Sequence, residues 1–215
     1  MNKQHVLILT ALIVLASVIL GVLAYPHLPE TTASHWDELG NPNGYMSRFW
    51  LVALIPLLIA GLTAMLMVLP GIDPLRKNIT SFQNEYNQFI VFFGLFMLYI
   101  HTLSIFWNLG YKFNLSRLAT PGMGLFIFFV GTMVEKAKRN FFIGIRTPWT
   151  LSSDSVWDKT HWLGGKLFKA SGLLALGGFI FPDLSVYFLL IPLLGSSLFL
   201  LTYSYLVFRK ENLSA

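Results

Sequence analysis

The 215-residue sequence contains no cysteine. This absence excludes a disulfide framework, a thiolate metal site and a cysteine nucleophile. Charge is also scarce, because only 12% of the residues are Asp, Glu, Lys or Arg, against about 25% in an ordinary soluble domain. Apolar residues make up 55% of the chain, and the mean hydropathy is +0.64. A chain of this size cannot bury so much apolar surface in water, since small domains keep a large exposed fraction. The composition therefore predicts a membrane protein.

Long apolar runs account for most of the chain. A membrane-spanning helix needs roughly 20 mostly apolar residues. Six segments meet or approach this length: 5–24, 49–69, 87–109, 119–135, 166–181 and 185–208. The first run is longer than the hydrophobic region of a typical signal peptide, so we interpret it as an anchor. The predicted fold is an all-α polytopic membrane protein with six transmembrane helices in a single membrane domain, residues 1–215.

The basic residues divide unequally between the two predicted sides of the membrane. If the N terminus is cytoplasmic, six crossings return the C terminus to the cytoplasm. The outer side then holds Arg48, Lys112 and Arg117, and the inner side holds the other twelve of the fifteen Lys and Arg residues. An excess of Lys and Arg in cytoplasmic loops is the usual orientation signal. We therefore predict cytoplasmic termini, and we interpret the pI of 9.5 as a sign of topology and not of direct nucleic-acid binding.

Ionisable groups are nearly absent from the apolar runs. His101 is the one candidate near mid-depth, and Asn108 lies on the same segment. Ionisable groups inside a bilayer often mark a transport path or a functional site. Two interpretations stay open here: a polar seam used by a ligand or ion, and hydrogen bonding between helices, worth about 1 kcal/mol per bond.

Residues 25–48 form a predicted structured outer loop. Three prolines preclude a regular helix throughout, and Asn43-Gly44 favours a tight turn. We expect a short hairpin with Ser34–Glu38 in one arm and Gly44–Ser47 in the other. The loop also holds side chains of the types that bind metals: His27, Glu30, His35, Asp37 and Glu38. Their spacing fits no specific zinc pattern, so we predict a structured cap and no metal site.

Residues 136–165 form a predicted folded loop on the cytoplasmic side, between the fourth and fifth helices. Pro148 biases Thr147 toward extended backbone, and Gly144 permits a conformation or a close approach that other residues resist. We therefore expect residues 140–150, called the strap below, to be folded and non-helical. Its aromatic residues would press it against the bundle or the membrane interface.

A helix is predicted to follow the strap, with Ser152 or Ser153 as its N-cap. It can continue into the fifth apolar run, 166–181, through a bend at Gly164-Gly165. Two roles stay open for Arg146. Its guanidinium group can be presented to a partner or to lipid phosphate, or it can form an internal salt bridge to one of three acids: Asp154, Asp158 or Glu135.

Two groups of motifs resemble a known family. The outer loop contains Tyr25-Pro26-x-Leu28-Pro29, His35-Trp36 and Gly40-x-Pro42-x-Gly44; the cytoplasmic loop contains Asn140, Gly144-Ile145-Arg146-Thr147-Pro148-Trp149-Thr150-Leu151 and Val156-Trp157. In this order they resemble the two signatures of the SdpI-like bacterial membrane proteins. Ala33, Arg48 and Gly131-Thr132 depart from the proline, lysine and Gly-Asn that are common at these places in the family.

The resemblance implies a multi-pass protein of a bacterial-type cell membrane with a non-enzymatic immunity function. Such proteins protect the producing cell from a secreted toxic peptide that collapses the proton-motive force. They also act as receptors that hold a cytoplasmic repressor at the membrane when toxin is present. The expected partners are membrane lipid, the toxic peptide and the repressor, and no cofactor is expected.

The resemblance also assigns residues to these roles. The expected toxin-facing residues in the outer loop are Tyr25, Pro26, Pro29, His35, Trp36, Gly40 and Gly44. The expected partner-binding residues on the cytoplasmic side are Asn140, Gly144, Arg146, Thr147, Pro148, Trp149, Thr150 and Trp157.

The sequence also has features relevant to two other classes of function. A small-molecule or ion transporter would use the polar seam around His101, but a coupling carboxylate deep in a helix is missing. A membrane enzyme would need a nucleophile with its base, or a metal constellation, and none stands out. No catalytic residue is therefore predicted. The cluster of His35, Asp37 and Glu38 is the one place to test for enzyme activity.

Overall fold

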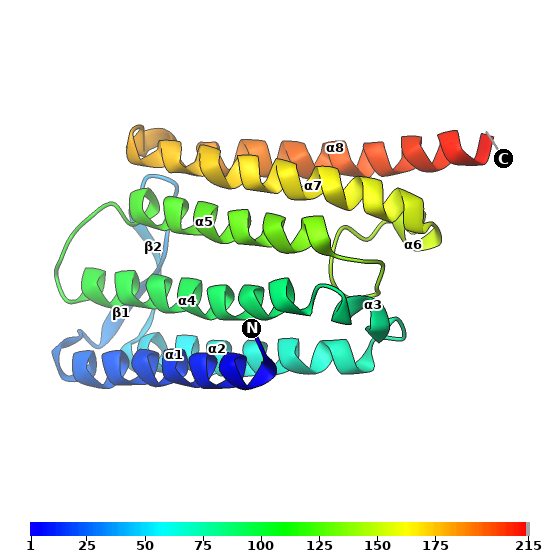
Figure 1. The fold of residues 1–215 in the computed structure, drawn as a ribbon. Helices are drawn as coiled ribbons and strands as arrows, with labels where there is room; N and C mark the ends of the chain where they lie inside the picture. Colours follow the sequence, from blue (N-terminus) through cyan, green and yellow to red (C-terminus); the bar gives the residue numbers. More distant parts are fainter. Residues whose placement is uncertain (214–215) are drawn as a thin grey trace.

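Six long helices lie side by side in the computed structural model, which describes residues 1–213 (Figure 1). They are α1 (Lys3–Ala24), α2 (Arg48–Ile72), α4 (Gln83–Asn108), α5 (Leu115–Lys136), α7 (Asp154–Leu174) and α8 (Ser185–Leu213). Short elements lie between them: η1 (Tyr25–His27), α3 (Arg76–Thr80), α6 (Pro148–Ser152), η2 (Ala175–Phe179) and η3 (Pro182–Leu184). Because a bilayer core offers the backbone no hydrogen-bond partners, apolar runs of this length are stable there as helices.

Five of the long helices are long and apolar enough to cross a membrane: α1, α2, α4, α5 and α8. By length and composition the chain is thus an all-α polytopic membrane protein. The predicted crossing at 166–181 does not meet this criterion. The helix found there, α7, carries three charged residues in its first half and two in its second: Asp154, Asp158, Lys159, Lys166 and Lys169.

The apolar run at 166–181 covers only the second half of α7 and the short η2 that follows it. α7 begins at Asp154 because the Ser153 side chain caps it and accepts a hydrogen bond from the Val156 N–H group. The helix is continuous through Gly164 and Gly165, where a bend was predicted, and the chain then tightens into η2. The predicted N-cap at Ser153 and the predicted continuation of this helix into the fifth apolar run are confirmed.

The bundle consists of two groups of three helices. Figure 1 places α1, α2 and α4 together and α5, α7 and α8 together, with α4 beside α5. Glycines bring α5 and α7 into backbone contact: a Cβ atom added at Gly131 would lie 2.7 Å from the carbonyl oxygen of Gly165. Glu135 and Lys169 form an ion pair across the same contact. Small residues at a helix interface permit such close approach in membranes.

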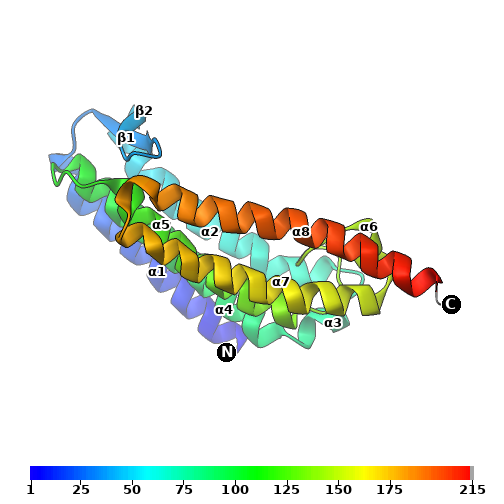
Figure 2. The same cartoon turned by 90° about the horizontal axis from the view of Figure 1, so that it is seen from above.

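A two-stranded antiparallel hairpin extends beyond one end of the bundle (Figure 2). β1 (Thr31–Trp36) pairs with β2 (Pro42–Ser47), so the predicted hairpin is confirmed with slightly different arms. The turn predicted at Asn43-Gly44 is wrong, because these residues lie in β2 and the Asp37 carboxylate closes the turn by accepting from the Asn41 N–H group. Gly40, with φ of +82°, permits the turn between the two strands. This end is called the hairpin end below. The strap lies at the opposite end, beside α3 and α6, which is called the strap end (Figure 2).

Each group of buried apolar residues lies near one end of the bundle. The group at the strap end joins α1, α3, α4, α5 and the strap: Val6, Ile79, Phe82, Tyr86, Ile90, Met133, Ala137 and Ile143. The group at the hairpin end is smaller: Ala24, Leu28, Leu51 and Ile105. Large apolar side chains elsewhere on the long helices are exposed on the outer faces, as a lipid environment requires. The buried apolar contacts between elements are thus concentrated at the two ends of the bundle.

Candidate functional site

Asn108, at the last turn of α4, fastens the hairpin to the bundle. Its side-chain oxygen accepts a hydrogen bond from the Ala33 N–H group at 2.8 Å, and its amide nitrogen donates to the Ala33 carbonyl at 2.9 Å. The same nitrogen donates to the Ser104 carbonyl at 2.9 Å. Asn108 therefore bonds both backbone groups of a β1 residue, as a third strand would, and it is buried.

Replacing Asn108 with leucine is expected to release the hairpin while the helices stay folded. The change leaves both polar groups of Ala33 buried without partners, which costs about 1–3 kcal/mol for each group. Limited proteolysis within 37–41, the turn of the hairpin, measures the effect. Asn212→Leu is the matched control, because Asn212 is exposed near the end of α8 and bonds only to Phe208 of its own helix. Equal cleavage rates in the two variants would contradict this role of Asn108.

The turn of the hairpin also rests on the first turn of α5. The Asn114 side chain donates to the Leu39 carbonyl at 2.8 Å, and the Ser116 hydroxyl donates to the Asp37 carbonyl at 2.8 Å. A Cβ atom at Gly40 would lie 2.5 Å from the Asn114 side-chain oxygen, so only glycine fits there. The hairpin is therefore held from both α4 and α5.

The predicted toxin-facing residues all lie at the hairpin end, but their exposure differs. Tyr25, Pro26, Pro29 and His35 are exposed; Trp36 and Gly44 are half-buried; Gly40 is buried. Trp36 packs edge-on against Trp107, with ring centroids 5.5 Å apart, and a Cβ atom at Gly44 would lie 2.9 Å from the Cβ of His35. The tryptophan and the two glycines build the cap, and the other four residues are on its surface.

The side chains of His35 and Asp37 bond within the hairpin itself. His35 hydrogen-bonds to Asn43 across the turn. The Asp37 carboxylate accepts from the N–H groups of Leu39 and Asn41 at 3.0 and 2.8 Å. Within residues 1–213, no three His, Asp or Glu side chains are grouped closely enough to hold a metal ion.

His101 lies inside the bundle and is completely buried. Its Nδ1 atom is 2.7 Å from the hydroxyl oxygen of Ser17 on α1. Thr102 and Ser104 bond to carbonyl groups one turn back in α4. The predicted seam is thus divided: His101 joins α4 to α1, and Asn108 joins α4 to the hairpin. This arrangement favours hydrogen bonding between elements over a path for a ligand.

At the opposite end, Asn140 organises the strap. Its side-chain oxygen accepts from the N–H groups of Phe142 and Ile143 at 2.9 and 2.6 Å. Its amide nitrogen donates to the carbonyl groups of Lys138 and Ile143 at 2.8 and 2.9 Å. The side chain is completely buried. One amide thereby bonds four backbone groups that no regular helix or strand would pair.

Trp157 and His161 of α7 form the surface on which the strap rests. They are stacked with ring centroids 3.9 Å apart and are almost completely buried. The Trp157 indole N–H donates to the Ala137 carbonyl at 2.8 Å, and the Ile145 N–H donates to Nε2 of His161 at 2.9 Å. Gly144, with φ of +124°, brings the backbone against the rings, where a side chain would meet Nε2 of His161. The predicted close approach at Gly144 is confirmed.

Thr147 and Thr150 end the strap by capping α6. Each hydroxyl bonds to the backbone N–H of the other residue, and Pro148 is the first residue of the helix. Thr147 is extended, as predicted, and its hydroxyl lies 3.1 Å from that of Ser204 on α8. Trp149 packs on Tyr205 of the same helix. The last part of the strap is therefore helical and not irregular as predicted, because this capping box begins a helix at Pro148.

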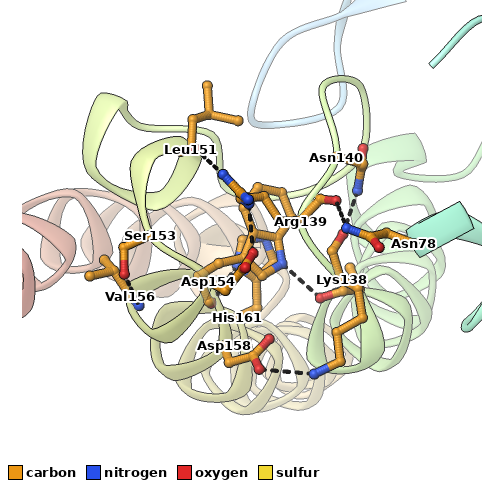
Figure 3. A network of polar contacts seen from close by, with 12 residues as sticks. Asn78, Lys138, Arg139, Asn140, Leu151, Ser153, Asp154, Val156, Asp158 and His161 are labelled. Carbon is orange, nitrogen blue, oxygen red and sulfur yellow. Dashed lines mark hydrogen bonds and ion pairs between the residues drawn. The ribbon is translucent and has the colours of Figure 1, made fainter. Parts of the chain in front are cut away.

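The salt-bridge interpretation of Arg146 is wrong. Among residues 1–213 its three suggested partners bond to other cations. Asp154 bonds to Arg139 and Asp158 to Lys138 (Figure 3), and Glu135 bonds to Lys169. Arg146 donates instead to the Phe141 carbonyl, and its side chain is exposed. It is the only exposed charged residue of the predicted cytoplasmic set.

The bonding partners of His161 fix its protonation state. Nδ1 lies 2.9 Å from the Trp157 carbonyl and donates to it, so Nε2 is the lone pair that accepts from Ile145. Burial lowers the pKa of His161 from 6.5 to about 4, and the hydrogen bond to Trp157 and the charge of Asp158 oppose this only in part. A proton on Nε2 would face the Ile145 N–H group and break the contact with the strap.

The strap is therefore expected to lose stability as the pH falls from 6.5 toward 4. In this range the unfolded chain binds a proton that folded His161 does not, which destabilises the strap by up to about 3 kcal/mol; above 6.5 there is no effect. Hydrogen exchange of residues 137–150, compared with His161→Gln at each pH, measures it. Glutamine keeps an acceptor but cannot titrate. If the variant shows the same pH dependence, His161 is not the responsible group.

Four residues of this end escaped sequence reasoning. The buried Asp73, at the C-terminal end of α2, accepts from the Phe141 N–H group at 2.9 Å, and Asn78 of α3 donates to the Arg139 carbonyl at 2.7 Å (Figure 3). From α8, Ser204 meets Thr147, and Glu211 bonds to Ser155 and Lys159 at 2.7 Å. Of these four, only Asp73 had a signal in the sequence, because it is an acidic residue directly after an apolar run.

Two family models match separate parts of the chain. The SdpI/YfhL protein family matches residues 136–205, from the last residue of α5 through the strap and into α8. A domain of unknown function, DUF1648, matches residues 12–60, from α1 through the hairpin into α2. The Immunity protein SdpI of Bacillus subtilis (strain 168) is 31% identical to the chain over 183 residues, which are 84% of this chain and 81% of that protein. The chain belongs to the SdpI/YfhL family. No solved structure matches it.

The residues that carry the SdpI/YfhL resemblance coincide with the two folded ends. The first signature builds the hairpin and its turn, and the second builds the strap and the first turns of α7. Most of the second signature faces inward, where Asn140, Thr150 and Trp157 are completely buried. For this family member the signature therefore encodes a local fold that presents Arg146 at its surface.

Proposed function

We propose that this SdpI/YfhL protein is a non-enzymatic immunity protein that protects its cell from a secreted, membrane-active toxic peptide. The observation that carries this proposal is the 31% identity to Immunity protein SdpI across 84% of the chain. The hairpin end supports it, because a small structured cap with exposed aromatic, proline and histidine side chains suits contact with a peptide at the membrane surface.

The proposal includes a topology with six crossings and both termini in the cytoplasm. It is supported by the distribution of the basic residues, because Arg48, Lys112 and Arg117 lie at the hairpin end and the other twelve lie in α7 or toward the strap end. In this topology α7 enters the bilayer after Lys166, and its charged first half stays at the cytoplasmic surface. Single cysteines introduced at Asn43 and Asn212 would report the two sides through a membrane-impermeant thiol reagent, since the chain has no cysteine of its own.

We further propose that the strap end binds a cytoplasmic repressor when toxin occupies the hairpin end. Arg146, Phe141 and Phe142 are exposed on the strap, and they offer a guanidinium group and two aromatic rings to a protein surface. Such a surface suits reversible docking, since arginine and aromatic residues are enriched at binding hot spots.

The proposal is tested by measuring the membrane potential of toxin-sensitive cells that are challenged with the toxic peptide of the family. Cells that express this protein should keep their potential, and control cells should lose it. His35→Ala should weaken protection, because it changes the exposed surface of the hairpin. Arg146→Ala should retain protection and lose only recruitment of the repressor, which a fluorescent fusion of the repressor reports. A wild-type protein that inserts normally and gives no protection would refute immunity against that peptide.

A further inference from the structure

An apolar groove lies on the side of the bundle, where the two groups of helices meet. It encloses about 450 Å³ and is lined by α4, α5 and η2, with Phe92, Phe96, Tyr99, Leu125, Phe126 and Phe179 among its residues. The volume falls within the usual range for sites that bind small molecules, roughly 300–1,000 Å³. The phenol of Tyr99 donates to the Leu118 carbonyl at 2.9 Å, so the hydroxyl group at the floor of the groove is already bonded. The groove therefore suits an apolar chain.

The groove is a built feature and not a gap between mobile side chains. Phe96 and Phe126 stack with centroids 5.2 Å apart and an interplanar angle of 13°. Gly122 lies directly beneath Tyr99, where a Cβ atom would be 2.5 Å from the ring. Aromatic rings held by such contacts lose little freedom when a ligand binds, so the groove is pre-organised.

Arg117 stands at the rim of this groove, at the hairpin end. Its guanidinium group donates to the carbonyl of Phe179, a lining residue, at 3.2 Å, and the side chain is exposed. It forms no ion pair with any acid of residues 1–213. Arg117 also lies in the first turn of α5, where the helix dipole disfavours a cation. An anionic ligand at this position would offset both disadvantages.

We propose that the groove and Arg117 together bind one anionic phospholipid, with an acyl chain in the groove and the phosphate at the guanidinium group. Arginine binds phosphate well because its planar fork of donors matches the phosphate oxygens. A helix from a second copy of the chain would fill the groove but would bring no anion to Arg117. The lipid would contact α4 and α5 at once, and would therefore join the two groups of helices.

Native mass spectrometry of the full-length protein tests the proposal. The protein is released from detergent in the presence of equal amounts of phosphatidylglycerol and phosphatidylcholine with the same acyl chains. The wild type is expected to retain phosphatidylglycerol over phosphatidylcholine by roughly fivefold, the factor for one cation beside an anionic headgroup. Arg117→Gln is expected to bring this ratio close to one. Lys112→Gln is the matched control and should keep the ratio, because Lys112 is also a cation of the hairpin end but lies over the Trp107 ring.

A second variant tests the groove itself. Leu125 lines the groove and is exposed on the outer face of α5, so Leu125→Trp should fill the groove without disturbing the fold. It is expected to reduce retention of both lipids. Equal retention of the two lipids by the wild type, or an unchanged ratio in Arg117→Gln, would overturn the proposal. A lipid-free dimer, displacement of phosphatidylglycerol by excess inorganic phosphate, or full retention by Leu125→Trp would overturn it too.

Discussion

Replacing Trp157 with alanine is expected to detach the strap from the bundle. Trp157 is completely buried, stacks on His161 and holds the Ala137 carbonyl through its indole N–H group. Removing a buried tryptophan side chain costs about 3–5 kcal/mol, and the Ala137 carbonyl is then buried without its partner. The rigid surface under Gly144 is lost as well, so the strap should exchange its amide hydrogens freely.

Hydrogen exchange of residues 137–150 and thermal melting in detergent measure this effect. Trp162→Ala is the matched control, because Trp162 lies on the same helix but is 53% exposed, and Lys166 lies over its ring. It should change the melting temperature little. Trp157→Phe should fall between the two, since phenylalanine keeps a ring to stack on His161 but has no N–H group to donate. Equal losses at Trp157 and Trp162 would contradict the role of Trp157 as the support of the strap.

The second large effect is expected at the contact between α5 and α7. Replacing Gly165 with leucine places a side chain where the Cβ atom alone would lie 2.7 Å from the Gly131 carbonyl oxygen and 2.8 Å from the Cα of Glu135. These neighbours are backbone atoms, so no rotation of a side chain can relieve the clash. The helices must separate, and the ion pair between Glu135 and Lys169 must break. Overpacking alone costs about 1–3 kcal/mol or more, before the loss of the ion pair.

The yield of monodisperse protein and its melting temperature in detergent measure the second effect. Gly195→Leu serves as the control, because nothing lies within 4 Å of a Cβ atom at Gly195 in α8. The control should behave as the wild type does. If Gly165→Leu also gives normal protein, the close approach of the two helices does not contribute to the stability of the bundle.

The helices that were predicted best are those whose apolar length matches the thickness of a bilayer. An apolar run long enough to span a bilayer can only be helical, so α1, α2, α4, α5 and α8 were located within a few residues. The hairpin was predicted, but its turn was placed at Asn43-Gly44, which lies within β2; Asp37 and Gly40 form the turn instead. The beginning of α7 was predicted from its N-cap, Ser153, and not from hydrophobicity, which does not distinguish a helix from a loop in the polar first turns.

The site was predicted in its residues but only partly in its contacts. Positions with a local constraint, such as Gly144, Thr147 and the N-cap Ser153, were interpreted correctly, because backbone conformation is decided within a few residues. Contacts between distant segments were not. The partners of Arg146 and the bond from Asp73 to the strap depend on how helices far apart in sequence are placed, and neither periodicity nor spacing specifies that.

α2 is a single helix that joins the hairpin end of the protein to the strap end. β2 ends at Ser47 and α2 begins at Arg48 without a linker, and the residue that ends α2, Asp73, accepts the Phe141 N–H group at 2.9 Å. A hydrogen bond is lost when this distance passes about 3.5 Å. We therefore expect α2 to transmit an axial displacement from the hairpin to the strap. A shift of roughly 1 Å imposed on the hairpin would break the hydrogen bond between the Phe141 N–H group and Asp73. A shift smaller than the rise of one helical residue, about 1.5 Å, is then enough for a contact at the hairpin end to change the strap end.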